Sequence, residues 1–327
     1  MLKVAMLSRW HVHADEYART VINTGKAEIT CVWDDDAARG AKFAQDLNCD
    51  FEPDLDKLLA RDDVDAVVCT TATTLHHDVL IKVARAGKHI FTEKALAPTV
   101  KECEEIAAEI EKAGITFVIS MPGRNSPVIR LAKKLIDEGA FGKISLVRMR
   151  NGHDGVSGGG LPKYWFDESM AGGGALMDLG CHPMYQACYL LGKPKRISAI
   201  LTSPYGNPVD EAATASIEFE NGAVCTAETS FVTFNTPGAI EIYGSDATLL
   251  AYGNSVKFYN KTLKQYTKEY VVPDLPEQLP IPLIMFVDAC VNGTGTPENF
   301  GTKDAIDLTR LLENSYISNR ENRIVEL

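Results

Sequence analysis

The sequence predicts an α/β protein in which a doubly wound parallel sheet precedes a second, α+β domain. In the first third of the chain, short β-branched runs alternate with amphipathic segments of helical period. This alternation is typical of a parallel sheet covered by helices. After about residue 122, several strand-like runs follow one another with few helices between them, which indicates antiparallel pairing. A chain of 327 residues also exceeds what one hydrophobic core usually organises.

The first domain, residues 1–122, is expected to contain five strands and four helices. Strands are expected at 4–7, 29–33, 66–70, 89–92 and 116–119. Helices are expected at 14–24, 37–47, 76–86 and 100–113. Gly87 and Gly114 lie where two of these helices should end, because glycine readily adopts the left-handed conformation that follows a helix.

The second domain, residues 123–327, is expected to combine helices with a mostly antiparallel sheet. Helices are expected at 127–138, 175–191, 283–291 and 303–319. Strands are expected at 143–150, 196–201, 213–219, 223–231, 239–243 and 256–259. The sequence ENGA at 220–223 is typical of a hairpin turn, and a glycine-rich loop covers 152–160.

Composition and charge disfavour several classes of partner. The net charge of −11 opposes binding to nucleic acid and to anionic membrane surfaces. The N-terminus leads into a strand without signal-peptide features, and no apolar run approaches the about 18 residues of a membrane span. The eight cysteines include no C-x-x-C pair and suit a reducing cytoplasm. We therefore expect a cytoplasmic protein. For Cys181, a catalytic thiol is the alternative to a buried, unreactive cysteine.

The turn after the first expected strand reads Ser-Arg-Trp-His, where a dinucleotide-binding turn would carry Gly-x-Gly-x-x-Gly. Glycine serves there because it lets the backbone approach a diphosphate without a Cβ atom in the way. Without gaps, Ser8, Trp10 and His13 occupy the three glycine positions; an alternative alignment through VHA at 12–14 makes the loop two residues short. Ser8, Arg9 and His11 offer side-chain donors beside a helix N-terminus, which itself favours anions. We expect the protein still to bind the dinucleotide cofactor, through a phosphate-binding turn of altered shape.

Acidic and basic residues follow two further strands of the first domain. Asp34 ends the second expected strand, where a carboxylate can accept hydrogen bonds from an adenosine ribose. Asp35 and Asp36 follow it and would repel the extra phosphate of NADP, so NAD is favoured; the alternative is a solvated, helix-capping turn. Glu93 and Lys94 lie at the carboxyl end of the fourth strand, where Lys94 could stabilise charge on a substrate oxygen. The alternative there is a surface ion pair.

The segment AGGGALMDLGCH at 171–182 contains a candidate proton-transfer pair. The glycine triplet permits a close backbone approach before a helix begins. Asp178 and His182 are four residues apart, so one helical face should present both. Histidine is the commonest proton-transfer side chain, and a nearby carboxylate can orient it. No metal site is predicted, because a third ligand is not evident. The alternative is a structural hydrogen bond.

The stretches TTATTLHHDVLIKVARAGKHIFTEKALAPTVKECEEIA and GGGALMDLGCH, with LIDEGAFGKI and the closing RENRIVEL, resemble the Gfo/Idh/MocA oxidoreductases. The resemblance implies an N-terminal Rossmann domain that binds NAD(P). It also implies a C-terminal α/β domain whose large open sheet often forms the oligomer interface, so a homodimer or homotetramer is expected. The usual reaction oxidises a ring hydroxyl, or reduces a ketone, on a sugar or cyclitol.

The resemblance also implies roles for individual residues. Lys94 matches a lysine that contacts the nicotinamide ribose and the reacting oxygen, and His182 with Asp178 matches a pair whose histidine accepts and donates the proton. Asp34 matches the ribose-binding acid. The expected cofactor-binding set is Ser8, Arg9, Trp10, His11, Asp34, Asp35, Thr71, Thr73, His76, Glu93 and Lys94. The expected substrate-binding set is Lys94, Arg124, His153, Trp165, Asp178 and His182.

The chain departs from the family pattern at several positions. Ala95 replaces the proline of Glu-Lys-Pro, and Ala72 that of Pro-Asn-x-x-His, so the backbone is less rigidly preset. Pro122 and Gly123 replace neighbours of Arg124 in a usual Asn-Arg-Arg-Phe segment.

The sequence as a whole predicts an NAD-dependent dehydrogenase or reductase acting on a sugar, sugar acid or cyclitol. Two alternatives stay open. One is transient use of NAD in glycoside hydrolysis or elimination. The other is a non-catalytic sugar-binding relative with a degenerate glycine turn, against which the joint presence of Lys94, Asp178 and His182 argues.

Overall fold

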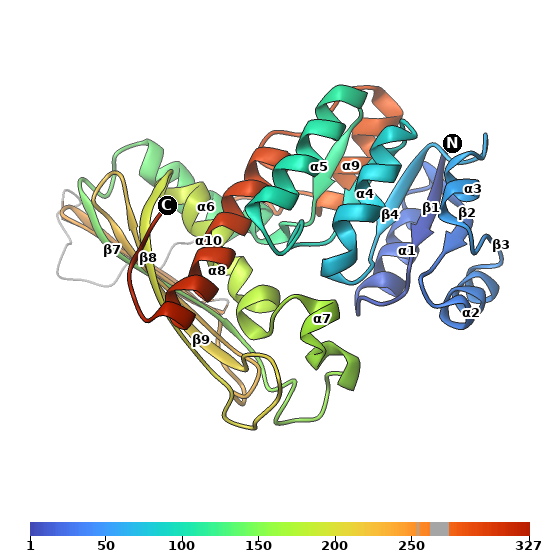
Figure 1. The fold of residues 1–327 in the computed structure, drawn as a ribbon. Helices are drawn as coiled ribbons and strands as arrows, with labels where there is room; N and C mark the ends of the chain where they lie inside the picture. The colour runs from blue at the N-terminus through green and yellow to red at the C-terminus, as the bar shows by residue number, and fades with distance from the viewer. Residues whose placement is uncertain (254, 262–274) are drawn as a thin grey trace. The chain divides into compact units, whose positions relative to one another are not determined.

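The computed structural model describes residues 1–253, 255–261 and 275–327, and the chain divides into two compact units (Figure 1). The first unit contains Met1–Met121 and Pro280–Thr309, and the second contains Pro122–Leu279 and Arg310–Leu327. This division corrects the expected one in one respect. Residues 280–309, which we assigned to the second domain, belong to the first unit, because their apolar helix packs against the first sheet.

The first unit is built on a six-stranded parallel sheet of order β3-β2-β1-β4-β5-β6. Its strands are β1 (Leu2–Leu7), β2 (Ala27–Trp33), β3 (Asp50–Phe51), β4 (Ala66–Cys69), β5 (His89–Thr92) and β6 (Phe117–Ile119). Every pairing in it is parallel. The order reverses between β1 and β4, which is the switch point at which doubly wound sheets bind ligands. The fold class expected for the first domain is therefore confirmed.

Six helices of the first unit accompany this sheet. They are α1 (Ala14–Asn23), α2 (Ala37–Leu47), α3 (Leu55–Leu59), α4 (His76–Arg85), α5 (Val100–Ala113) and α9 (Pro282–Asn292). Helix α5 shows why the boundaries could be predicted: Thr99 and Glu102 form a capping box, and Gly114 adopts φ 63° at the end. Helix α9 returns to pack on α1, β1, β5 and β6. The sequence analysis missed α3 and β3, which are too short to show a period.

The second unit is built on an eight-stranded sheet of order β13-β12-β11-β7-β10-β9-β8-β14. Its strands are β7 (Ile144–Gly152), β8 (Pro194–Thr202), β9 (Ala212–Phe219), β10 (Val224–Ser230), β11 (Ala239–Gly244), β12 (Ala247–Tyr252), β13 (Ser255–Asn260) and β14 (Val325–Glu326). Only β7 and β10 pair in parallel. The expected mostly antiparallel sheet is therefore confirmed, with β12 and β14 as strands that we missed.

One face of this sheet is covered by helix and the other is open. In β9, the buried residues alternate with exposed ones, as a half-buried strand requires. The buried face packs against α8 (Cys181–Leu191) and the helical turn before it. The other described helices beginning in this unit are α6 (Pro127–Asp137) and α7 (Glu168–Ala171), and α10 (Thr302–Glu321) runs across the division between the units.

The expected helix at 175–191 differs from the structure at its start. Residues Leu176–Gly180 form a π-helical turn, and the α-helix begins only at Cys181. Asp178 therefore lies on the wider π-helical turn and His182 on the α-helix, which corrects the expectation of one continuous α-helix from residue 175. A Cβ atom at Gly180 would lie 2.9 Å from Leu176 and 3.2 Å from Thr229, so the packing there is tight.

Candidate active site

The turn after β1 retains a glycine-like backbone without glycine. Ser8 is fully buried with φ 73°, in the left-handed region that non-glycine residues seldom adopt. Its N–H donates to the Trp33 carbonyl at 2.6 Å, and its Oγ accepts the Trp10 N–H at 3.1 Å. Trp10 and His11 are buried, at 3% and 5% exposed. The side chain of Ser8 therefore stabilises the turn from within, and its hydroxyl also donates to Asp35 at 3.3 Å.

The carboxylate of Asp34 is held by four N–H donors inside the protein. It accepts the backbone N–H groups of Arg9 at 2.8 Å and Asp36 at 2.9 Å, and the guanidinium of Arg39 bonds to both of its oxygens. The same guanidinium lies 2.8 Å from Asp35. Asp36 caps α2 by accepting the N–H groups of Ala38 and Arg39. The alternative interpretation, a helix-capping turn, therefore applies to Asp36. A ribose that binds to Asp34 would have to displace the guanidinium of Arg39.

Glu93 and Lys94 are buried at the carboxyl edge of the first sheet, at 1% and 5% exposed. The surface-ion-pair alternative is therefore wrong. Glu93 accepts hydrogen bonds from the Tyr17 hydroxyl and the Lys94 N–H, and lies 2.9 Å from Nδ1 of His13. Burial alone would raise the pKa of Glu93, but the charges of His11 and Lys94 and the hydrogen bond of His13 hold it well below its usual value.

His76 is fully buried and links segments of the first unit. Its Nδ1 lies 3.1 Å from the carbonyl oxygens of Ala95 and Leu96, and its Nε2 lies 3.3 Å from that of Thr71. Burial lowers the pKa of His76. Thr71 and Thr73 are buried beside it in sequence, at 1% and 8% exposed. His76 therefore ties the loops after β4 and β5 together, so its proposed part in cofactor binding is one of positioning.

In the second unit, a buried aspartate holds the glycine triplet. Asp210 accepts the N–H groups of Gly174 at 2.9 Å and Leu176 at 2.7 Å, and the Tyr316 hydroxyl at 2.8 Å. A Cβ atom on Gly174 would lie 1.9 Å from the Asp210 carbonyl oxygen, so only glycine fits. Sequence reasoning missed Asp210, because its partners are 34 to 106 residues away and no local pattern marks it.

Tyr185 connects His182 to the backbone of another segment. His182 is partly exposed, and its Nδ1 lies 2.8 Å from the hydroxyl of Tyr185. That hydroxyl also accepts the Gly123 N–H at 2.9 Å. With His182, Arg150, Asn151 and Gln186 line a cavity of about 570 Å³. The histidine thus lines a cavity within its own unit, and one of its ring nitrogens is held by a buried tyrosine.

The other expected residues of the second unit occupy separate positions. Arg124 is buried and stacks its guanidinium on the rings of Tyr185 and Tyr189, at 5.7 and 5.6 Å. The His153 ring stacks on Phe231, and Trp165 is 4% exposed. None of these three is among the residues that line the cavity with His182.

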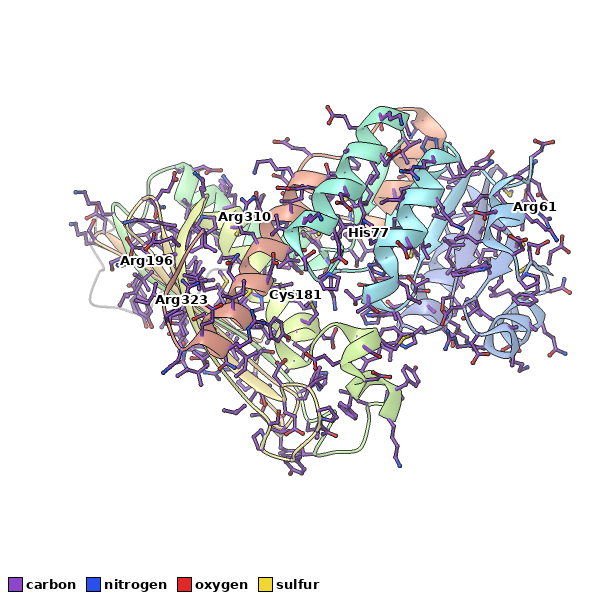
Figure 2. The ribbon with its side chains drawn as sticks, viewed as in Figure 1. Arg61, His77, Cys181, Arg196, Arg310 and Arg323 are labelled. Atoms are coloured by element: carbon purple, nitrogen blue, oxygen red, sulfur yellow. The ribbon has the colours of Figure 1, made fainter. Side chains whose placement is uncertain are left out.

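The thiol of Cys181 (Figure 2) is buried and donates to the Asp178 carbonyl at 2.8 Å. A thiol used in this way inside a helix is not presented to a substrate. The catalytic-thiol alternative therefore loses its support.

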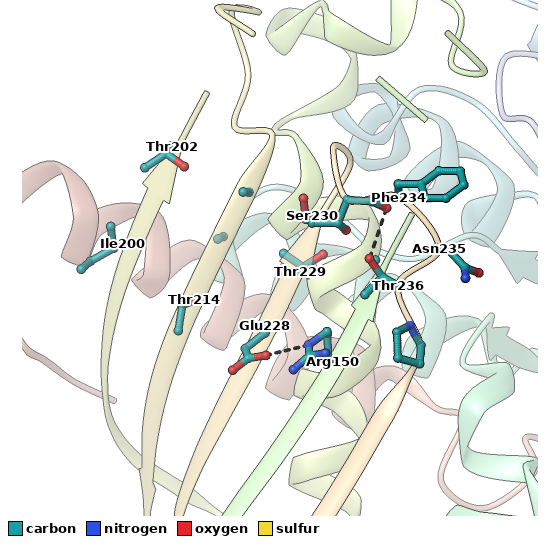
Figure 3. A pocket seen from close by; sticks show the side chains of 15 residues that line it. Arg150, Ile200, Thr202, Thr214, Glu228, Thr229, Ser230, Phe234, Asn235 and Thr236 are labelled. Atoms are coloured by element: carbon teal, nitrogen blue, oxygen red, sulfur yellow. Dashed lines mark hydrogen bonds and ion pairs between the residues drawn. The ribbon is translucent and has the colours of Figure 1, made fainter. Parts of the chain in front are cut away.

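A second hollow of about 770 Å³ lies on the open face of the second sheet (Figure 3). Arg150 and Glu228 pair there at 2.8 Å, on directly opposed positions of β7 and β10. Ile200, Thr214 and Phe234 also line it. Figure 3 shows Arg150, Glu228, Thr214 and Ile200 on neighbouring strands and Phe234 on a loop.

The sheet order, its switch point and a buried carboxylate and lysine at its carboxyl edge define the class of dinucleotide-binding oxidoreductases. Residues 10–120 match the family described as "Oxidoreductase family, NAD-binding Rossmann fold", and residues 129–250 match the "GFO/IDH/MocA C-terminal domain". The chain belongs to the GFO/IDH/MocA family of oxidoreductases, and its first unit contains the NAD-binding Rossmann domain of that family.

Several known proteins are similar to this chain. Levoglucosan dehydrogenase of Pseudarthrobacter phenanthrenivorans is 31% identical over 218 residues, which cover 58% of this chain and 55% of that protein. The 2,7-anhydro-N-acetylneuraminate hydratase of Mediterraneibacter gnavus is 35% identical over 129 residues, covering 39% of this chain and 34% of that protein. The matches thus span about half or less of these relatives. The structure of levoglucosan dehydrogenase with NADH and L-sorbose has a TM-score of 0.87 at 21% identity, covering 100% of this chain and 98% of that one, so the fold is shared.

Among the described residues, no helix has the length and apolar character needed to cross a bilayer.

Proposed function

We propose that the protein is an NAD-dependent dehydrogenase or reductase that acts on a hydroxyl or keto carbon of a sugar, sugar acid or cyclitol. The observation that carries this proposal is the buried Glu93-Lys94 pair at the carboxyl edge of a parallel sheet. Burial of a lysine is costly unless its charge is used or paired. Family membership supports the same reaction class.

The first unit fits a dinucleotide at the edge where β1, β2 and β5 end. Ser8 keeps the backbone conformation that glycine usually supplies, and Asp34 and Asp35 follow β2, where a ribose would bind. Bound NAD supplies the hydride acceptor or donor. We assign its binding to the turn of Ser8, Arg9, Trp10 and His11, to Asp34 and Asp35, and to Thr71, Thr73, His76, Glu93 and Lys94. The acidic pair disfavours the 2′-phosphate of NADP.

The chain's own residues would handle charge and protons. The Lys94 ammonium stabilises negative charge on the reacting oxygen. His182 accepts the hydroxyl proton at Nε2 during oxidation and returns it during reduction, while Nδ1 stays against Tyr185. Asp178 orients substrate or histidine. Arg124, His153 and Trp165 are assigned to the substrate side of the second unit.

Calorimetric titration and steady-state kinetics test this proposal. The protein should bind NAD more tightly than NADP, and one of a panel of sugars and cyclitols should change the bulk NADH concentration. Lys94→Ala and His182→Ala should each lower kcat by about 10²–10⁴-fold. Lys82→Ala is the matched control, since Lys82 is exposed and pairs with Asp56. Folded protein that binds neither cofactor, or normal turnover in both site variants, would refute the proposal.

A second candidate is hydrolysis or elimination at a glycosidic bond with NAD regenerated in each cycle. The similarity to a protein named a hydratase favours it. Product formation without net change in NADH would distinguish this reaction from the first. The non-catalytic alternative predicts sugar binding without turnover of either kind.

We also propose a cytoplasmic homodimer or homotetramer with a small-molecule carbohydrate or cyclitol as its substrate. The open sheet face supports the oligomer, because exposed apolar side chains such as Leu146 and Ile200 lie on it. The negative charge of the chain argues against nucleic acid and membrane partners.

A further inference from the structure

Two histidines of the glycine-free turn meet a buried carboxylate in the first unit. His11 and His13 lie between β1 and α1, and Glu93 directly follows β5. Nδ1 of His13 lies 2.9 Å from Oε1 of Glu93, and Nδ1 of His11 lies 3.9 Å from the same oxygen. One possible ligand atom from each residue lies within 4.8 Å of the other two. In the part of the chain that the structure describes, this is the one group of three or more His, Cys, Asp or Glu side chains so arranged.

The surrounding contacts hold these three side chains in place. The His11 N–H donates to the Thr70 carbonyl at 3.1 Å, which fixes the turn to the segment after β4. The His13 N–H donates to Nδ1 of His11 at 3.2 Å, a hydrogen bond that a metal ion bound at this nitrogen would replace, and the two rings lie 4.8 Å apart. Tyr17 donates its hydroxyl to Glu93 and contacts Ser120 at 2.8 Å. Supporting hydrogen bonds of this kind orient the ligands of metal sites.

The distances suit a small divalent cation. With bonds of about 2.0–2.2 Å, the donor atoms of a tetrahedral site lie about 3.4 Å apart. The two measured separations, 2.9 and 3.9 Å, lie on either side of this value. Small rotations of the two imidazole rings would therefore close the site. The His13 side chain is 42% exposed, so an ion has a route from solvent and keeps a position for water.

The donor set and its charge indicate the class of ion. Two imidazole nitrogens and one carboxylate oxygen suit Zn²⁺, Co²⁺, Ni²⁺ and Fe²⁺ better than Ca²⁺ or Mg²⁺, which prefer oxygen ligands. Glu93 is buried, and a buried carboxylate requires a compensating positive charge nearby. A divalent ion would supply that charge without requiring the histidines to be protonated.

We propose that His11, His13 and Glu93 bind one divalent transition-metal ion, with at least one coordination position open to solvent. This site goes beyond the proposed dehydrogenase function, and it shares His11 and Glu93 with the residues proposed to bind the cofactor. It also assigns a role to His13, which the proposed cofactor-binding set does not include. The sequence analysis predicted no metal site because the third ligand is 80 residues from His13.

Metal titration of the full-length protein tests the site. Chelator-stripped protein is titrated with ZnCl₂ by calorimetry and with CoCl₂ by visible absorption, beside His13→Ala and Glu93→Gln. The control is His77→Ala, because His77 (Figure 2) is a histidine of α4 in the same unit that also lies between two carboxylates, Asp78 and Glu105.

The wild-type protein and His77→Ala should bind one equivalent of Zn²⁺ with micromolar or tighter affinity, and Co²⁺ should give a tetrahedral or five-coordinate spectrum. Each site variant should bind about 100-fold more weakly. Less than stoichiometric binding by the wild type, or undiminished binding by His13→Ala, would overturn the proposal. If Glu93→Gln does not fold, His13→Ala decides alone, because its side chain is half-exposed. NADH affinity, measured separately, reports on the proposed function.

Discussion

Tyr185 is the residue that most directly controls the ring of the proposed proton-transfer histidine. Its hydroxyl lies between Nδ1 of His182 and the N–H of Gly123, and its side chain is fully buried. Because the hydroxyl can accept a hydrogen bond from the Nδ1–H group, it favours the tautomer in which Nε2 is free to act as a base. Tyr185 is therefore a positioning residue rather than a catalytic one.

Tyr185→Phe should lower kcat about tenfold while KM changes little, because the substrate still binds but the ring of His182 loses its partner. The loss of the Gly123 hydrogen bond should also lower the free energy of unfolding by about 1–2 kcal/mol. Steady-state kinetics and urea unfolding measure the two effects. Tyr189→Phe is the control, because in the described residues the ring of Tyr189, not its hydroxyl, makes the observed contacts with Arg124 and Lys133. An unchanged kcat in Tyr185→Phe would show that the tyrosine has no positioning role.

At the scale of elements, the position of the helical segment that contains Asp178 and His182 depends on the hydrogen bonds at its N-terminal end. Asp210, from the loop between β8 and β9, caps the start of that segment, and the Tyr316 hydroxyl of α10 supports the cap. Burial raises the pKa of Asp210, although the hydrogen bonds it accepts act in the opposite direction. Gly174 lets this loop approach and Gly173 leaves room for Tyr316, so these two glycines serve packing.

Gly174→Ala should lower the free energy of unfolding by about 2–4 kcal/mol, since the added methyl group would lie 1.9 Å from a backbone oxygen. Turnover should fall with it, because the helix would shift. Gly160→Ala is the matched control: the nearest atoms to its added carbon are 4.0 Å away. Thermal and urea unfolding measure both variants, and equal stabilities would contradict the packing argument.

His76 makes the stability of the first unit depend on pH. Burial lowers its pKa, so on acidification the unfolded chain takes up a proton before the folded chain does. Its contribution to stability is therefore complete above the ordinary histidine pKa of about 6.5 and is lost as the pH falls towards the lowered value. Each pKa unit of difference corresponds to about 1.4 kcal/mol.

The wild type should lose more unfolding free energy between about pH 7.5 and pH 5.5 than His76→Gln does. Glutamine retains an N–H donor for the surrounding carbonyl groups but does not titrate. Urea unfolding at the two pH values measures the difference, and the half-buried His89, whose pKa burial also lowers, is common to both proteins. Identical losses in the two proteins would exclude His76 as the source.

At the scale of the whole molecule, the proposed homodimer or homotetramer would form through the open face of the second sheet. Its charged centre is internally paired, since Arg148 and Arg150 both bond to Glu228. Around this centre Leu146 and Ile200 are 56% and 70% exposed. A paired polar centre with exposed apolar neighbours is a surface that a second copy can cover at little electrostatic cost.

Ile200→Arg should lower the mass of the particle in solution, because the new charge would be buried without a partner in the proposed interface. Light scattering after size-exclusion chromatography measures that mass across a range of concentrations. Val291→Arg is the control, since Val291 is a 48% exposed apolar residue of α9 in the first unit. A wild type that is monomeric throughout, or an unchanged oligomer in Ile200→Arg, would contradict the proposed interface.

The sequence by itself determined the elements whose causes are local. The strands and helices of the parallel sheet follow from period, caps and glycine stops, as in α5 with Thr99 and Gly114. Lys94 and His182 could be predicted as site residues because short motifs contain them, and their roles stay predictions. The turn at Ser8 was predicted to be a phosphate-binding turn without glycine. Its left-handed backbone conformation could not be predicted, because serine seldom adopts that conformation.

Only the tertiary structure decided the features that join distant residues. In the structure, residues 280–309 belong to the first unit, and a π-helical turn forms the start of the helix predicted at 175–191. The guanidinium of Arg39 pairs with the carboxylate of Asp34. The tertiary structure also brought Glu93 to His13 across 80 residues, and Asp210 to Tyr316 across 106. The physical reason is that period and capping act within a few residues of the chain, whereas a buried charge selects its partners from whatever the packed core brings within hydrogen-bond distance.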